Sequence, residues 1–155
     1  GQRVPQLDPE KCRGCKVCQV EKNCPIKVAG LKEGRLVIDE NECNHCGRCM
    51  GKCPFGALEN YVNGYRIYIG GHWGKKVARG RYLDKVFTDK EEVLAIVEKA
   101  ILLFREQGIT GERFADTVER IGFEQVQKQL LADDLLARKQ ENISAQKHMK
   151  GGATC

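Results

Sequence analysis

Two short cysteine-rich runs constrain this chain more than any other feature of its sequence. They read CRGCKVCQVEKNCP and CNHCGRCMGKCP, and each ends in Cys-Pro. Eight of the nine cysteines lie in them: Cys12, Cys15, Cys18, Cys24, Cys43, Cys46, Cys49 and Cys53. Thiols at such short, regular intervals are typical of metal or cluster ligands in a reducing compartment rather than of a disulfide framework.

The last cysteine of each run is set apart from the three before it. Three thiolates two residues apart on a tight loop can hold three corners of a 4Fe–4S cluster, and the fourth corner then comes from the other run, as in two-cluster bacterial ferredoxins. Residues 5–60 resemble those ferredoxins closely. We therefore expect two clusters with crossed ligation. The predicted sets are Cys12, Cys15, Cys18 and Cys53 for the first cluster and Cys43, Cys46, Cys49 and Cys24 for the second.

The first run departs from the usual spacing, because five residues separate Cys18 from Cys24 where the second run has three. We expect Gln19 to Asn23 to form an extra loop there. Zinc is the alternative occupant, since paired CxxC motifs also make zinc sites. Two CxxCxxC triplets closed by Cys-Pro fit zinc poorly, so clusters are the preferred interpretation.

The residues around the cysteines predict local structure. Glu33 and Gly34 form a turn signal before a short strand, Arg35–Ile38. His45 is expected to be a solvent-facing loop residue rather than a ligand. Five apolar residues near the ligands are expected to exclude water from the clusters: Ile26, Val28, Val37, Phe55 and Ala57.

Composition bounds the remaining possibilities. The chain has 155 residues, 41% hydrophobic and 30% charged, which suits one medium domain or two small ones. It has no apolar run of membrane-spanning length and no secretory leader, so we expect a cytoplasmic protein that does not insert into membranes. The net charge of +5 falls to about +1 when two clusters of about −2 each are counted, so no nucleic-acid partner is predicted.

The segment after the cysteine runs begins with a predicted strand, Tyr65–Ile69, ended by two glycines. A loop with one tryptophan, Trp73, and four cations follows: Lys75, Lys76, Arg79 and Arg81. A solvated basic loop and an anion-binding loop are both compatible with this composition. A nucleotide phosphate loop is not, because GGHWGKK lacks the required spacing and hydroxyl.

Three helical segments complete the chain. A capping box at Thr88 and Glu91 and a stop at Gly108 bound the first. Its predicted buried face, packed on the sheet of Tyr65–Ile69, comprises Val93, Leu94, Val97, Ala100, Ile101 and Phe104. Residues 111–122 form a second helix that presents Phe114, Val118 and Ile121 on one face, and residues 123–140 form a third. Arg113 and Arg120 are predicted to be surface or ion-paired residues, and no residue is predicted to be catalytic.

The stretch from YRIYIGGHWGKK to GERFADTVERIGFEQV resembles the C-terminal part of siroheme-dependent sulfite and nitrite reductases. The smaller anaerobic and dissimilatory sulfite reductase subunits, which carry an inserted two-cluster ferredoxin module, are the most alike. The resemblance implies electron transfer towards a siroheme and a six-electron reduction of sulfite or nitrite. It also implies that Lys75, Lys76, Arg79 and Arg81 bind siroheme carboxylates.

One departure from that family limits the prediction. The family holds its siroheme-coupled cluster with further cysteines upstream of the ferredoxin insert, and no cysteine precedes Cys12. The spacings Cys18-x5-Cys24 and Cys49-x3-Cys53 match those of the family's further cysteine pairs. That assignment, however, leaves the other four cysteines of the two CxxCxxC triplets without a cluster. We therefore expect the electron-input module and the end of the reductase fold without the catalytic centre, as a fragment, a split subunit or a derived relative.

These inferences define an α+β chain in three parts: a two-cluster ferredoxin module at 5–60, a sulfite reductase-like α/β segment at 61–140, and a mobile polar tail at 141–155 that contains Cys155. The predicted function is electron transfer within a siroheme-type reductase; the alternative is a cluster-bearing docking subunit. Siroheme is expected only at an interface or outside this chain. The expected partners are redox donors and acceptors or the rest of a reductase, and self-association stays open.

Overall fold

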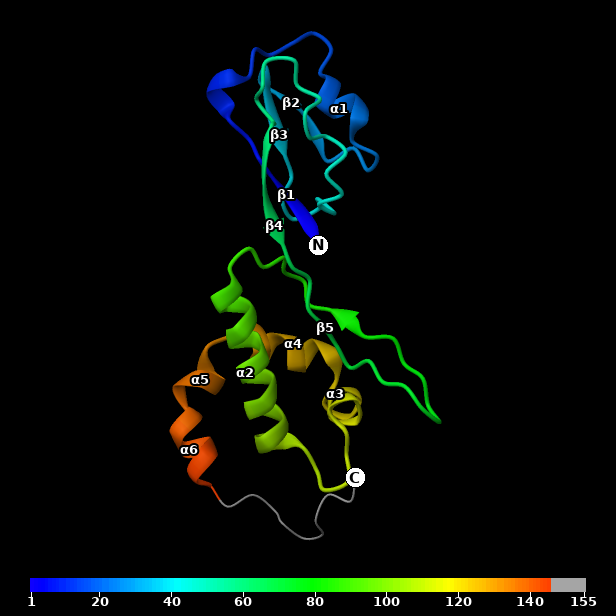
Figure 1. The fold of residues 1–155 in the computed structure, drawn as a ribbon, viewed down its shortest axis with the longest axis vertical. Helices are drawn as coiled ribbons and strands as arrows, with labels where there is room; N and C mark the ends of the chain where they lie inside the picture. Colours follow the sequence, from blue (N-terminus) through cyan, green and yellow to red (C-terminus); the bar gives the residue numbers. More distant parts are fainter. Residues whose placement is uncertain (146–155) are drawn as a thin grey trace. The chain divides into compact units, whose positions relative to one another are not determined.

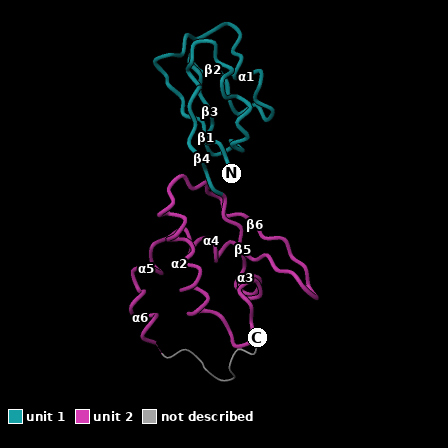
Figure 2. Tube along the Cα trace, in the orientation of Figure 1, with its two compact units in different colours: residues 1–65 teal, residues 66–155 magenta. Residues whose placement is uncertain are grey.

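The computed structural model describes residues 1–145 of the chain, which form two compact units, residues 1–65 and residues from 66 onward (Figures 1 and 2). Helices and short strands are mixed, as the predicted α+β class requires. The division falls five residues after the expected boundary at residue 60. The reason is that β4 (Asn60–Gly64) pairs with β1 (Gln2–Gln6) and so belongs to the first unit.

The first unit holds two antiparallel strand pairs. In the first pair, β1 and β4, Val4 lies opposite Val62, and the turn η1 (Pro9–Lys11) follows β1. In the second pair, β2 (Ala29–Lys32) meets β3 (Arg35–Ile38). The predicted turn and strand are confirmed, because Glu33 and Gly34 both have positive φ, 50° and 74°, which a two-residue hairpin favours.

The extra residues between Cys18 and Cys24 do not form the expected loop. They form the short helix α1 (Gln19–Asn23), with Cys18 at its N-cap, Cys24 at its C-cap and Val20 fully buried. The segment lacks glycine and proline, so nothing in it opposes a helical turn. Five helical residues advance the chain only about 7.5 Å, so the longer spacing adds little distance between the two cysteines.

The first unit has a small core to which most of the cysteines belong. Val20, Cys24, Ala29, Leu36 and Leu58 are buried, and Cys12, Cys18, Cys49 and Cys53 pack against them. The prediction that five apolar residues exclude water from the clusters is only partly right. Ala57 is buried and Val28 half-buried, but three members are exposed, because they lie on surface turns and on an outward strand position: Ile26, Val37 and Phe55.

The second unit begins with a hairpin rather than with the predicted five-residue strand. Only Tyr68–Ile69 is a strand, β5, and it pairs with β6 (Arg81–Tyr82). Gly70, at φ 75°, ends β5, and a bridge between His72 and Ala78 continues the antiparallel pairing. The predicted basic loop is therefore an arm of two antiparallel segments, which extends from β5 and β6 away from the helices in Figure 1.

The long helix α2 (Lys90–Gln107) was predicted with the wrong cap. Asp89, not Thr88, is the N-cap residue, and its carboxylate accepts a hydrogen bond of 3.0 Å from the Glu91 amide. Gly108 does end the helix, as expected. A Cβ at Gly108 would lie 2.5 Å from the Phe104 carbonyl oxygen, so only glycine fits this turn.

The buried face of α2 also differs from the prediction. Of the predicted residues, Val93, Ala100 and Phe104 are half-buried, whereas Leu94, Val97 and Ile101 are 50–64% exposed. The fully buried residues of the helix are Ile96, Lys99, Leu102 and Leu103. The helix packs mainly against the helices that follow it, and Ile69 of β5 joins the same core. Burial of Lys99 is compensated by an ion pair of 2.9 Å with Asp133.

Four shorter helices follow α2. In α3 (Phe114–Ile121), Val118 is buried and Phe114 and Ile121 are half-buried, so these three residues do form the inner face, as predicted. The helix ends at Gly122. The single helix expected over 123–140 is three helices, because the chain leaves helical geometry after Leu131 and again at Arg138. They are α4 (Phe123–Leu131), α5 (Asp134–Ala137) and α6 (Lys139–Ser144).

The predicted tail at 141–155 is wrong for its first residues, since α6 extends to Ser144 and is held to α2 through Asn142, whose side chain donates to the Leu102 carbonyl. Residues 146–155, with Cys155, lie outside the described part. Arg120 is ion-paired, as expected: it donates to Glu112 at 2.6 Å and lowers the pKa of that carboxyl to about 2. No helix within residues 1–145 is long and apolar enough to span a bilayer.

Candidate metal centre

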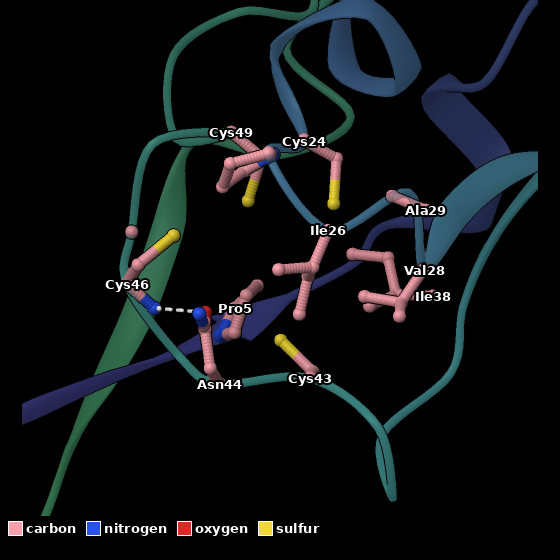
Figure 3. Close-up of a pocket in the computed structure, with 12 residues that line it drawn as sticks. Pro5, Cys24, Ile26, Val28, Ala29, Ile38, Cys43, Asn44, Cys46 and Cys49 are labelled. Carbon is pink, nitrogen blue, oxygen red and sulfur yellow. Dashed lines mark hydrogen bonds between the residues drawn. The ribbon is translucent and has the colours of Figure 1, made fainter.

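Four cysteines from both runs line one hollow in the first unit. Cys43, Cys46 and Cys49 come from the second run, and Cys24 comes from the end of α1. Figure 3 shows their four sulfur atoms turned towards the space between them. These are the residues predicted for the second cluster, and the structure brings them together.

The wall between these thiols is apolar. Pro5, Pro25, Ile26, Val28, Ala29 and Ile38 line it, and no charged side chain does. Asn44 fixes the loop, since its side-chain oxygen accepts from the Cys46 amide at 3.2 Å (Figure 3). A hollow of four thiols and aliphatic side chains is chemically suited to a soft, thiolate-bound iron–sulfur cluster.

His45 lies inside this loop and is half-buried, not solvent-facing as expected. Its backbone takes the left-handed conformation at φ 53°, which turns its amide towards the Cys43 sulfur at 3.4 Å. Its carbonyl accepts from the Arg3 amide of β1 at 3.2 Å. The residue therefore contributes backbone contacts that support the cysteine loop.

The electrostatics of the hollow oppose four bare thiolates. Burial raises the pKa of Cys49, and the charges of Cys43, Cys46 and Cys24 raise it further, against one backbone hydrogen bond. At Cys24 burial is also the largest influence and acts upward, but backbone amides of residues 26–29 together outweigh it and lower the pKa. A cationic iron core removes the repulsion between the thiolates, so the donor set fits such a group.

The first predicted set is held by the same small core. Cys12, Cys18 and Cys53 pack against it, and Cys15 is half-buried. The amides of Gly14 and Leu36 lower the pKa of Cys12, and the Leu36 nitrogen lies 3.3 Å from its sulfur. The alternative assignment, in which Cys18, Cys24, Cys49 and Cys53 hold one siroheme-coupled cluster, is disfavoured. Cys24 and Cys49 share their hollow with Cys43 and Cys46 rather than with Cys18 and Cys53.

A close backbone contact fixes the Cys12–Cys15 loop. A Cβ placed at Gly14 would lie 2.3 Å from the Gly34 carbonyl oxygen in the β2–β3 turn. Gly14 also has a positive φ of 59°. The loop thus approaches the hairpin at a distance that only glycine allows.

A site for a single metal ion, such as zinc, needs a different arrangement of ligands from a site for an iron–sulfur cluster. Within residues 1–145 no three Cys, His, Asp or Glu side chains gather closely enough to hold one metal ion. A zinc ion would need four ligands around one centre, whereas a cubane cluster spreads its thiolates over separate corners.

The predicted basic residues are not gathered into one site. Arg81 is engaged within the chain: it pairs with Glu124 at 3.0 Å and lies over the Phe123 ring at 3.9 Å. Lys75, Lys76 and Arg79 are exposed on the arm, with no ion-pair partner among the described residues. Trp73 beside them is 82% exposed.

Sequence reasoning missed the backbone donors to sulfur at Leu36 and His45. Every residue except proline carries an amide, so side-chain identity gives no signal for such a contact. Only the positive φ at His45 is unusual, and a histidine in a turn tolerates it better than a β-branched residue does.

The comparisons with known proteins identify an iron–sulfur protein family. The family model described as "Nitrite and sulphite reductase 4Fe-4S domain" matches residues 11–138, so the chain belongs to that family. The coenzyme F420-dependent sulfite reductase of Methanocaldococcus jannaschii is 27% identical, over 63% of this chain and 20% of that protein. The indolepyruvate oxidoreductase subunit IorA of Pyrococcus horikoshii is 37% identical, over 38% of this chain and 9% of that protein.

A dissimilatory sulfite reductase I crystal structure aligns with 85% of this chain and 31% of that chain, at 23% identity and a TM-score of 0.45. The matched part of the chain spans 20% of the coenzyme F420-dependent sulfite reductase and 9% of IorA, far less than the length of either relative. The prediction of a sulfite reductase-like iron–sulfur protein with a ferredoxin-type region is confirmed. The number of clusters, their ligands and siroheme stay predictions.

Proposed function

We propose that this chain transfers electrons through two 4Fe–4S clusters, as the ferredoxin-containing part of a siroheme-type sulfite or nitrite reductase. The clusters supply one-electron carriers that can be oxidised and reduced without a change of ligands. The chain's own part is to hold them with two sets of thiolates, exclude water with aliphatic side chains and donate backbone hydrogen bonds to sulfur. No residue is assigned a role in bond chemistry.

The arrangement of Cys24 carries this proposal. It belongs by sequence to the first run, yet it shares a hollow with the three cysteines of the second run. Crossed ligation needs that arrangement, because each CxxCxxC triplet leaves one cluster corner open. The helix α1 supports it by ending at Cys24 with Val20 anchored in the core.

Siroheme is proposed only for a larger assembly. Its carboxylates need several cations, and Lys75, Lys76 and Arg79 are the exposed ones on the arm. Arg81 is less suited to binding a siroheme carboxylate, because it already forms an ion pair with Glu124. An arm that projects cannot enclose a large ligand alone, because ligand sites are concave, so a second surface would be needed.

A cluster-bearing docking subunit is the second candidate, and one observation favours it. Leu94, Val97 and Ile101 form an exposed apolar stripe along α2, at the i, i+3 and i+7 spacing of one helix face. Such stripes often mark protein contacts. Intact clusters that exchange no electrons with any carrier would favour this candidate over electron transfer.

An anaerobic reductive titration tests the proposed function. The purified, cluster-loaded chain should accept about two electrons, one for each cluster, with matching loss of visible absorption. It should return them to an added one-electron acceptor. A chain with full iron content that accepts none would contradict an electron-transfer role.

A further inference from the structure

We propose that the strand β3 sets the reduction potential of the first cluster, and that Arg35 is the residue whose charge makes this cluster easier to reduce. This inference rests on the proposed function, because it concerns how one of the two clusters takes up its electron. Arg35 is not a predicted ligand. Its side chain reaches the loop that carries Cys12, the first cysteine of the first ligand set.

The carbonyl oxygen of Pro9 joins Arg35 to Cys12. It accepts a hydrogen bond of 3.3 Å from Nη1 of Arg35 and another of 3.3 Å from the Cys12 amide. These two donors on one oxygen place the guanidinium beside the backbone of a predicted ligand. Arg35 and Pro9 are 26 positions apart in sequence, so the fold, and not the local chain, brings this charge to the cysteine loop.

The next residue of β3 contacts the predicted ligand itself. The amide nitrogen of Leu36 lies 3.3 Å from the Cys12 sulfur. Strand pairing leaves this amide available, because Leu36 lies opposite Leu31, next to the Lys32–Arg35 pair that closes the two-residue turn, and ladder hydrogen bonds alternate along an antiparallel pair. Amide donors to ligand sulfur stabilise the more negative state of a cluster, so this contact acts in the same direction as the charge of Arg35.

The electrostatics of Cys12 agree with these contacts. Backbone hydrogen bonds from Gly14 and Leu36 are the largest causes that lower the pKa of this thiol, and the charge of Arg35 lowers it further, against the effect of burial. The turn before β3 also lies close to the cysteine loop, since a Cβ at Gly14 would overlap the Gly34 carbonyl oxygen. Groups that stabilise a thiolate by their charge also stabilise an electron added beside it.

The carboxylates near Arg35 do not change the sign of this effect. Glu10 and Glu33 are exposed close to it in the chain, and Asp8 pairs with Lys11 at 3.4 Å. The ion pairs found within residues 1–145 include none between Arg35 and a carboxylate. Substitution of Arg35 leaves all three carboxylates in place, so the direction of the expected shift depends on the lost positive charge alone.

The step is the addition of one electron, and no bond forms or breaks. A reductant loses the electron, and the charge of a cubane with its four thiolates changes from about −2 to about −3. A fixed cation stabilises the more negative form, so the cluster beside Arg35 should be reduced at a higher potential than it would be without this residue. The wall of the second hollow contains no charged side chain, so we expect the effect at the first cluster only.

An anaerobic redox titration of the cluster-loaded chain, followed by EPR, tests the proposal at low ionic strength. Arg35→Gln should lower one of the two midpoint potentials, with about a threefold fall in the ratio of reduced to oxidised cluster at a fixed potential, or about 28 mV, since tenfold is 59 mV for one electron. Arg35→Lys keeps the charge and should show less than half of this shift. Arg113→Gln makes the same change at an exposed arginine of the second unit, and it should leave both potentials unchanged.

Ionic strength separates an effect of charge from damage to the cluster site. The Debye length falls from about 10 Å at 0.1 M salt to about 3 Å at 1 M, so the shift caused by Arg35→Gln should shrink as salt is added. A distorted site would keep its shift at high salt. The shift should also appear in the Cys24→Ala background, which is expected to keep the first cluster alone.

Three results would overturn the role of Arg35: unchanged potentials in Arg35→Gln, an equal shift in Arg35→Lys, or a shift that salt does not reduce. Iron content and the number of electrons accepted are measured on every variant and on the unaltered chain. An unaltered chain that holds iron but accepts no electrons would count against the proposed function instead.

Discussion

Cys24→Ala is expected to lower the iron content from about eight to about four atoms per chain, with an equal loss of acid-labile sulfide. Cys24 is the one residue of the first run that lines the hollow of the second. Without its thiolate the second cluster keeps only three protein ligands and should not survive purification. Cys155→Ala, which also removes one thiol but lies outside both runs, is the control and should leave the iron content unchanged.

Double variants distinguish crossed from uncrossed ligation. Cys24→Ala with Cys46→Ala removes two ligands of one predicted set, so the iron content should stay near four atoms. Cys24→Ala with Cys15→Ala removes one ligand from each set, so it should approach zero. The opposite pattern would mean that each run holds its own cluster, and it would contradict the interpretation of the hollow.

Gly14→Ala is expected to hasten loss of the clusters in urea about fivefold or more relative to Gly51→Ala. Both glycines have positive φ, 59° and 65°, so both substitutions carry a similar backbone penalty of about 1 kcal/mol. Only at Gly14 does the new Cβ meet a backbone oxygen, at 2.3 Å, whereas nothing lies within 4 Å at Gly51. Relief of that overlap should cost a further ~1–3 kcal/mol, and 1.36 kcal/mol corresponds to a tenfold rate change.

The measurement is the decay of visible cluster absorption under anaerobic conditions, at equal urea concentrations for both variants. Equal decay rates would show that the Cys12–Cys15 loop is free to move away from the β2–β3 turn. The contact at Gly14 would then have no part in holding the first cluster.

Much of the first unit was predictable because cysteine spacing and turn chemistry are local signals. The Glu33-Gly34 turn and the Arg35–Ile38 strand are present as expected. The helix between Cys18 and Cys24 was not foreseen, since an isolated five-residue helix is unstable and this one depends on burial of Val20. Its stabilisation is tertiary, and periodicity cannot reveal that in so short a segment.

The second unit shows a different limit. Periodicity located α2 and α3 but found only part of the buried face of α2, because apolar residues occur on more than one side of the helix. Which face is buried was decided by α4 to α6, whose breaks at Ala132 and Arg138 carry no glycine or proline signal. The basic residues illustrate the same point: the contact of Arg81 with Glu124 joins residues far apart in sequence.

Iron, acid-labile sulfide and siroheme per chain, measured on anaerobically purified protein, test the central claim most directly. Two 4Fe–4S clusters predict about eight iron and eight sulfide atoms, with no siroheme bound by the isolated chain. About four iron atoms would reduce the path to one cluster. Iron near zero with bound zinc would contradict the account altogether.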